Sequence, residues 1–167
     1  MRVKVLGLMA ALLLVAGCAE EQQQDTTTAT GGETMAPADT GGIVPGSQED
    51  LVVNVGDRVF FDFDKSDLRP DAIDTLNRQS DWLKQYPSVT VTIEGHCDER
   101  GTREYNLALG ERRASAAKQY LESTGIGGGR MDTISYGKER PAVLGSNEAA
   151  WAQNRRAVMV VKSGPGA

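Results

Sequence analysis

Regular apolar periodicity is confined to residues 51–161 of this 167-residue chain. Two helical patterns alternate there with short β-prone runs, which gives the order β-α-β-α-β, then a short helix and a last strand. Each of the two main helices has one apolar stripe, which must be buried by packing against a face of the sheet. The sequence therefore predicts an α/β (α+β) fold, a two-layer sandwich of two main helices packed on a mixed β-sheet of about four strands.

The limits of these elements follow from the apolar spacing and from helix stop signals. Helices are expected over 70–86, where Pro87 follows, and over 103–123, where Gly125 is a typical C-terminal stop. A short helical turn is expected over 147–154. The expected strands cover residues 51–53 together with 59–61, and residues 89–94, 131–136 and 155–161.

Charge is unevenly distributed along the chain. Residues 1–18 carry a net charge of +2, residues 19–50 carry −7, and residues 51–167 contain sixteen acids and sixteen bases. A neutral folded part has no broad basic field, which argues against general nucleic-acid binding. The two cysteines, Cys18 and Cys97, lie far apart, which excludes a disulfide-dense scaffold and a four-cysteine zinc site.

Residues 1–17 have the pattern of an export signal. Arg2 and Lys4 precede an apolar run over 5–16, which fits a secretory signal and is shorter than the roughly 20 residues that span a bilayer. The run ends in Leu-Val-Ala-Gly-Cys, which resembles a bacterial lipobox and implies cleavage before Cys18 and lipidation of its thiol. Ala19 is not the aspartate that commonly retains lipoproteins at the inner membrane, so the resemblance implies an outer-membrane anchor with the domain in the periplasm. A plain signal peptide with a chance cysteine is the alternative.

The segment after the leader is expected to be a disordered acidic tether. Residues 19–50 are rich in Gln, Thr, Gly, Ala and acids and contain no aromatic residue, so they cannot bury enough apolar surface to offset their ordering entropy. The expected organisation is thus a signal peptide over 1–17, a lipidated cysteine and tether over 18–50, and a folded domain over 51–167.

The densest polar cluster is Glu-Gly-His-Cys-Asp-Glu-Arg-Gly-Thr over 94–102, between a strand and a helix. His96 and Cys97 could form a nucleophilic pair, but neighbours on an extended segment point to opposite sides and the chain has one histidine. A metal site at His96, Cys97 and Asp98 is disfavoured because sequential ligands cannot readily surround one ion. The sequence therefore assigns no catalytic residue, metal or other cofactor.

Recognition of a small charged ligand is the third possibility for this cluster. Asn106, Leu109 and Arg113 stand at i, i+3 and i+7 and share one face of the following helix. With Asp98 at the loop, the acid could take an ammonium and the guanidinium a carboxylate of one zwitterion. From spacing alone, a solvated helix face with local ion pairs explains the same residues.

The stretch from Gly95 to Ala114, GHCDERGTREYNLALGERRA, resembles the signature of OmpA-like peptidoglycan-binding domains, and more narrowly that of the peptidoglycan-associated lipoproteins (Pal). FDFDK at 61–65, SYG at 135–137 followed by Arg-Pro, and NRRA at 154–157 recur in the family in the same order. The similarity covers about residues 55–162.

The resemblance implies a binding protein without enzymatic activity. Domains of this family bind the meso-diaminopimelate of the peptidoglycan stem peptide. The family's key acid matches Asp98, which should meet the ligand's ammonium, and its key arginine matches Arg113, which should meet the carboxylate. A basic pair, Arg155 and Arg156, matches positions near the site whose roles stay open. The implied ligand-binding residues are Asp98, Arg113, Asn106, Leu109, Phe63 and Asp64.

The same resemblance implies a place in the Tol–Pal envelope system, with peptidoglycan and periplasmic TolB as partners. The protein would tether the outer membrane to the cell wall and support its invagination during cell division. A wall hydrolase or thiol-dependent transferase using Cys97 and His96 is the main rival. A flagellar-stator-type protein is a third possibility, but it needs a membrane span longer than the run over 5–16.

Overall fold

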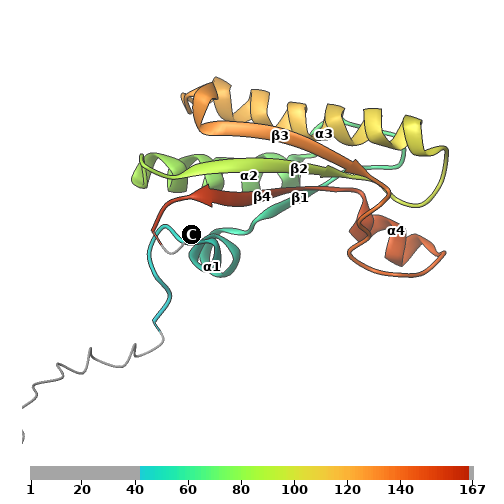
Figure 1. The fold of residues 1–167 in the computed structure, drawn as a ribbon, viewed down its shortest axis with the longest axis horizontal. Helices are drawn as coiled ribbons and strands as arrows, with labels where there is room; N and C mark the ends of the chain where they lie inside the picture. The colour runs from blue at the N-terminus through green and yellow to red at the C-terminus, as the bar shows by residue number, and fades with distance from the viewer. Residues whose placement is uncertain (1–41, 166–167) are drawn as a thin grey trace, which may run out of the picture. The chain divides into compact units, whose positions relative to one another are not determined.

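Four strands form one mixed sheet in the order β1-β4-β2-β3 (Figure 1). The strands are β1 (Arg58–Phe60), β2 (Thr90–His96), β3 (Met131–Gly137) and β4 (Arg156–Ser163). Strand β4 runs antiparallel to both of its neighbours, whereas β2 and β3 are parallel. The parallel pair is connected through a long helix, as parallel neighbours require.

The structure, a computed structural model, describes residues 42–165. The expectations for the signal peptide, for the lipidation of Cys18 and for the tether up to residue 41 lie outside the described residues. Within 42–165, no helix combines the length and the apolar character that a membrane crossing needs.

Two long helices, α2 (Pro70–Gln85) and α3 (Arg103–Ser123), pack together on one side of the sheet. Alternate residues of β2, Val91 and Ile93, join Leu76, Leu83 and Leu121 of the helices in the core, as the period of two in a half-buried strand requires. The fold also contains a short helix, α4 (Glu148–Asn154), and a 3-10 turn, η2 (Gly128–Arg130). The predicted two-layer fold is therefore confirmed.

The expectation of a strand over 51–53 is wrong. The chain forms a helical turn, α1 (Gln48–Asp50), followed by a π-helix, η1 (Leu51–Val55). Ser47 caps the turn by accepting a hydrogen bond from the backbone of Asp50, and Gly56 ends the π-helix at a φ of 97°, which glycine adopts without steric cost. Of the three β-prone residues, only Leu51 is buried. The contacts of the capping residues, and not the β-propensity of residues 51–53, therefore determine the conformation here.

The packed part extends to the N-terminal side of residue 51. Gly46, Ser47 and Asp50, which the sequence places in the tether, are buried. The Asp50 carboxylate accepts hydrogen bonds from the Trp82 indole at 2.9 Å and from the Gly46 backbone at 2.8 Å. These contacts fix the point at which the chain joins the domain.

Strand β2 and helix α3 meet backbone to backbone at Gly95 and Gly110. A Cβ on Gly95 would lie 1.8 Å from the Gly110 carbonyl oxygen. Gly95→Ala is therefore expected to push α3 away from the sheet and to lower the free energy of unfolding by about 3 kcal/mol or more, measured by urea denaturation. Gly127→Ala is the control, because a Cβ there meets nothing within 4 Å; equal losses in both variants would contradict the close approach.

Candidate functional site

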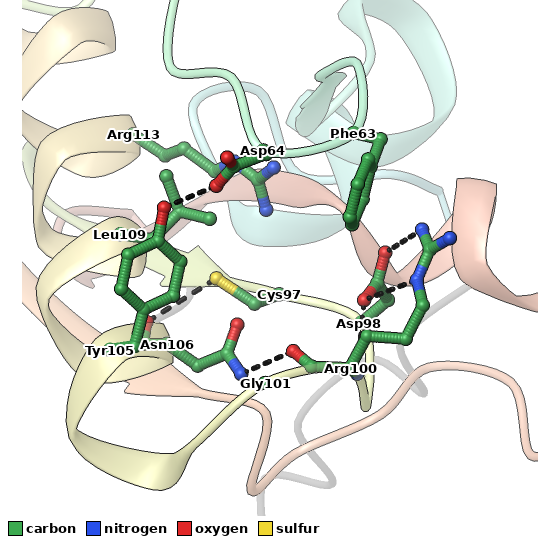
Figure 2. Close-up of a pocket in the computed structure, with 10 residues that line it drawn as sticks. All are labelled: Phe63, Asp64, Cys97, Asp98, Arg100, Gly101, Tyr105, Asn106, Leu109 and Arg113. Atoms are coloured by element: carbon green, nitrogen blue, oxygen red, sulfur yellow. Dashed lines mark hydrogen bonds and ion pairs between the residues drawn. The ribbon is translucent and has the colours of Figure 1, made fainter.

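Three segments surround a pocket of about 160 Å³ at the C-terminal end of β2 (Figure 2). They are the loop after β1, the loop after β2 and the first three turns of α3. All six ligand-binding residues implied by the sequence line this pocket. The complete lining is Phe63, Asp64, Cys97, Asp98, Arg100, Gly101, Tyr105, Asn106, Leu109 and Arg113.

Asp98 is buried and is held by two arginines. Arg100 donates to it from its backbone, from Nε at 3.2 Å and from Nη2 at 2.6 Å, and Arg155 donates from Nη1 at 3.4 Å. Burial alone would raise the pKa of Asp98, but the hydrogen bonds from Arg100 outweigh it and hold the pKa below its ordinary value. Asp98 is therefore ionised at neutral pH.

Arg100 lies at the mouth of the pocket between two aromatic rings. Its guanidinium carbon lies 3.9 Å from the centre of the Phe63 ring and 4.0 Å from that of Trp151, a cation–π arrangement on both faces. Arg100 is not among the ligand-binding residues that the family resemblance implies. Its place two residues after Asp98 is the local signal that could have found it, whereas nothing in the sequence points to Trp151.

Arg113 lines the pocket, but most of its N–H groups donate hydrogen bonds to the protein's own backbone. Its side chain is fully buried, with 0% exposed. It donates to the backbone carbonyls of Lys65 at 2.8 Å, His96 at 2.8 Å and Asp62 at 3.1 Å. A guanidinium has five N–H groups, so at most two remain for a ligand. Arg113 is thus first a clamp that joins the loop after β1 to the end of β2, which its helical spacing did not indicate.

Asn106 and Asp64 also organise the walls of the pocket. The Asn106 amide donates to the carbonyls of Arg100 at 2.7 Å and Thr102 at 3.0 Å, which fixes the loop after β2. The Tyr105 hydroxyl donates to the Asp64 carboxylate and so links α3 to the opposite wall. Leu109 is buried and supplies apolar surface between these polar groups.

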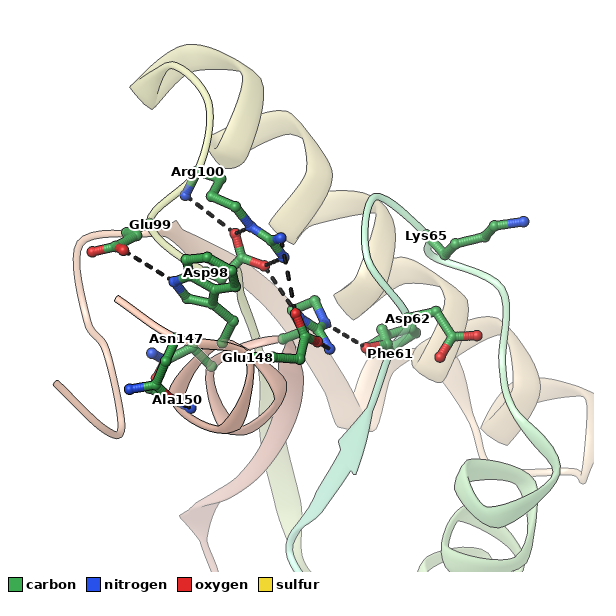
Figure 3. Close-up of polar contacts among 12 residues, drawn as sticks. Phe61, Asp62, Lys65, Asp98, Glu99, Arg100, Asn147, Glu148 and Ala150 are labelled. Carbon is green, nitrogen blue, oxygen red and sulfur yellow. Dashed lines mark hydrogen bonds and ion pairs between the residues drawn. The ribbon is translucent and has the colours of Figure 1, made fainter. Parts of the chain in front are cut away.

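The basic pair Arg155 and Arg156 divides between two environments. Arg155 donates to the Phe61 carbonyl at 3.0 Å, to Asp98, and to Glu148 at 2.7 Å. Figure 3 shows these three acceptors, with Asp98 also held by Arg100. Arg156 donates to the carbonyls of Asn154 and Arg140 instead. Neither residue is part of the pocket lining.

His96 and Cys97 do not form a nucleophilic pair. Cys97 is buried, and its thiol donates to the Asn106 carbonyl at 3.3 Å. Burial raises the pKa of this thiol to about 11, so it is protonated at neutral pH. His96 is buried at the end of β2; its Nε2 lies 3.5 Å from a Glu94 carboxylate oxygen, and neither ring nitrogen makes a hydrogen bond among the described residues.

The burial of His96 is expected to make the stability of the domain sensitive to acid. Burial, with the nearby Arg156 and Arg140, lowers the pKa of His96 to about 4. The unfolded chain takes up this proton near pH 6.5, so the free energy of unfolding is expected to fall by about 3 kcal/mol as the pH drops from 6.5 to 4. Urea denaturation across this range measures the loss, which His96→Gln should largely remove. An unchanged slope in the variant would show that another group is responsible.

The lining of the pocket combines equal numbers of opposite charges. Asp64 and Asp98 face Arg100 and Arg113 within one cavity, so its formal charge is zero. Within residues 42–165, no three His, Cys, Asp or Glu side chains are grouped to hold a metal ion. The arrangement suits a small ligand that carries both an ammonium and a carboxylate.

The chain is similar in sequence to a known protein family and to several of its members. The OmpA family model matches residues 60–155. A peptidoglycan-associated lipoprotein of Rhizobium meliloti is 60% identical over 121 residues, 72% of this chain and 69% of the relative. Its counterpart in Haemophilus influenzae is 50% identical over 101 residues, 60% of this chain and 66% of the relative.

Solved structures agree with this family. The crystal structure of the peptidoglycan-associated lipoprotein from Burkholderia pseudomallei is 44% identical, with a TM-score of 0.62 over 64% of this chain and 90% of that chain. The C-terminal domain of Helicobacter pylori MotB has a TM-score of 0.60 over 65% of this chain and 85% of that chain, at 17% identity, which shows likeness of fold alone. The chain therefore belongs to the OmpA family and, within it, to the peptidoglycan-associated lipoproteins.

Proposed function

We propose that this protein binds peptidoglycan non-covalently through the pocket beside Asp98 and recognises the meso-diaminopimelate of the stem peptide. The observation that carries the proposal is the pairing of two carboxylates with two guanidinium groups around one small cavity. The free end of diaminopimelate carries an ammonium and a carboxylate on the same carbon. A neutral lining with separated charges complements such a ligand without leaving an unpaired buried charge.

Each end of the ligand has a proposed partner. Asp98 accepts the ligand's ammonium. A carboxylate offers about four acceptor positions, and all four are in use. The ammonium must therefore replace one of the present donors. Arg100 is the donor to be displaced, since its side chain is 29% exposed and that of Arg155 only 7%. Arg113 offers its remaining N–H groups to the ligand carboxylate.

One such pocket binds weakly, because a few contacts must offset the freedom lost on association. The peptidoglycan layer repeats the same stem peptide, and a lipid on Cys18 would hold many copies of the protein against it, which raises the effective concentration. In this proposal the protein lies in the outer membrane, faces the periplasm and tethers that membrane to the wall. Membership of the peptidoglycan-associated lipoproteins supports its assignment to the Tol–Pal system, with TolB as partner and a role in invagination during division.

The experiment compares two kinds of wall. Full-length protein in detergent is sedimented with sacculi that contain diaminopimelate and with sacculi that contain lysine at the same position of the stem peptide. We expect at least tenfold stronger binding to the first, because the lysine side chain ends in an ammonium without a carboxylate. Equal binding to both would contradict diaminopimelate recognition, and binding to neither would contradict the function.

The same assay separates binding from catalysis. We expect no soluble wall fragments after incubation, because the protonated, buried Cys97 thiol is a poor nucleophile. Cys97→Ser is expected to sediment with sacculi as the unchanged protein does. Fragments released by the unchanged protein and not by Cys97→Ser would favour the thiol enzyme instead.

A further inference from the structure

We propose that the groove between helix α3 and the edge strand β3 binds an extended peptide with basic side chains, which adds a strand beside β3. This β3 groove is separate from the pocket, because its helical residues lie on another side of α3. Glu104, Leu107, Ala108 and Glu111 recur at i, i+3, i+4 and i+7 on one helix face. The groove is lined by Glu104, Leu107, Ala108, Glu111, Thr133, Ile134 and Ser135.

The backbone of β3 is available for pairing on one side. Among the described residues, β3 pairs with β2 alone and forms one edge of the sheet. It is seven residues long, and its central Ile134 is 38% exposed between Thr133 and Ser135. The opposite edge strand, β1, has only three residues and carries Arg58. Short, charged edge strands discourage pairing, whereas a long edge with an exposed apolar centre invites it.

The side chains beside this edge suit a peptide strand. Leu107, which is 47% exposed, and Ala108 offer apolar surface on the helix side, and Ile134 offers it on the other. A peptide in this position would gain backbone hydrogen bonds from β3, and its alternate side chains would contact the two surfaces. The groove therefore has both parts of a strand-addition site, a free backbone edge and flanking apolar contacts.

The two acidic side chains of the groove favour a peptide with basic residues. Glu104 and Glu111 lie seven residues apart on α3, which corresponds to about 10 Å along the helix. Side chains on one face of an extended peptide recur about every 7 Å, so two basic residues at positions two or four apart can reach both acids. Glu111 is held in place by the Thr133 hydroxyl, which donates to it at 3.0 Å.

The same acids disfavour the two occupants that this chain itself could supply. A second copy paired edge to edge would bring its own Glu104 and Glu111 towards the first pair. Residues 19–41 contain five acids and no lysine or arginine. Like charges repel in both cases, so a partner with a basic, extended segment fits best.

The test uses full-length protein and two blocked hexapeptides, Thr-Lys-Val-Lys-Val-Thr and Thr-Glu-Val-Glu-Val-Thr. Calorimetry is expected to give at least tenfold tighter binding of the lysine peptide. Hydrogen exchange is expected to slow in β3 when this peptide binds. Equal affinity for both peptides, or protection of the loop after β2 in place of β3, would overturn the proposal.

Two variants with the same change of charge sharpen the test. Glu104→Lys is expected to weaken binding of the lysine peptide at least fivefold, whereas Asp74→Lys, on the exposed side of α2, should leave it unchanged. Equal effects of the two variants would refute the site. Protection, without peptide, of the β3 amides that face away from β2 would identify an occupant supplied by the protein itself and would equally refute the proposal.

Discussion

Replacing Asp98 by Asn is expected to weaken binding to diaminopimelate-containing sacculi at least 30-fold. The substitution keeps the shape of the side chain and removes the charge that the ligand's ammonium is proposed to meet. Such a loss corresponds to about 2 kcal/mol, within the range for removing one partner of a buried charge pair. Sedimentation of full-length protein over a range of sacculus concentrations measures it.

The control is Asp81→Asn, because Asp81 is a well-exposed aspartate of α2 far from the pocket lining. Asp98 also contacts the buried Arg155, so thermal unfolding must show that the Asp98→Asn protein is folded at the assay temperature. Arg155 retains Glu148 as a partner, which should keep the domain folded. A folded Asp98→Asn protein that binds like the unchanged one would falsify the assigned ligand site.

Arg113→Ala is expected to lower the free energy of unfolding by about 4 kcal/mol. The change leaves three backbone carbonyls without their donor and opens a cavity where a large, fully buried side chain stood. The family resemblance implied only a ligand-binding role for Arg113. Urea denaturation of the purified protein measures the loss.

The neighbouring Arg112 gives a matched control. It is exposed, and Arg112→Ala is expected to change stability by less than about 0.5 kcal/mol. Arg113→Lys should recover part of the loss, because an ammonium can still donate to one or two of the carbonyls. If Arg113→Ala unfolds at the same urea concentration as the unchanged protein, Arg113 is not a structural clamp.

Most of the fold could be predicted because its elements are long and periodic. Helices α2 and α3 begin where the proline and the polar loop indicate, and β2 shows the alternation of a strand with one buried face. The prediction failed at 51–53, where three β-prone residues begin the π-helix η1. Contacts from Ser47 and Trp82 decide the conformation there, and apolar spacing carries no information on such contacts.

The pocket lining was predictable from two sources, the spacing along one helix and the family resemblance, which supplied Asp98 and the distant Phe63 and Asp64. Helical spacing placed Asn106, Leu109 and Arg113 on one face, and all three line the pocket. The clamping role of Arg113 could not be predicted, because its partners are backbone carbonyls, which every residue has. Arg100 has a local signal in its place two residues after Asp98, but its position between the rings of Phe63 and Trp151 follows from the fold alone.

Helices α1, which contains Gln48, and α4 lie towards opposite ends of the sheet (Figure 1). The Gln48 side chain donates to the Met159 carbonyl and accepts from the Val161 backbone, near the middle of β4, whereas Arg155, just before β4, donates to Asp98. The six residue steps from Arg155 to Val161 span about 20 Å along the strand. Under the proposed function, a pull between membrane and wall acts along the direction of β2 and β4. It therefore loads all the hydrogen bonds between these two strands at the same time. Resistance to such pulling depends on the barrier to unfolding and not on equilibrium stability.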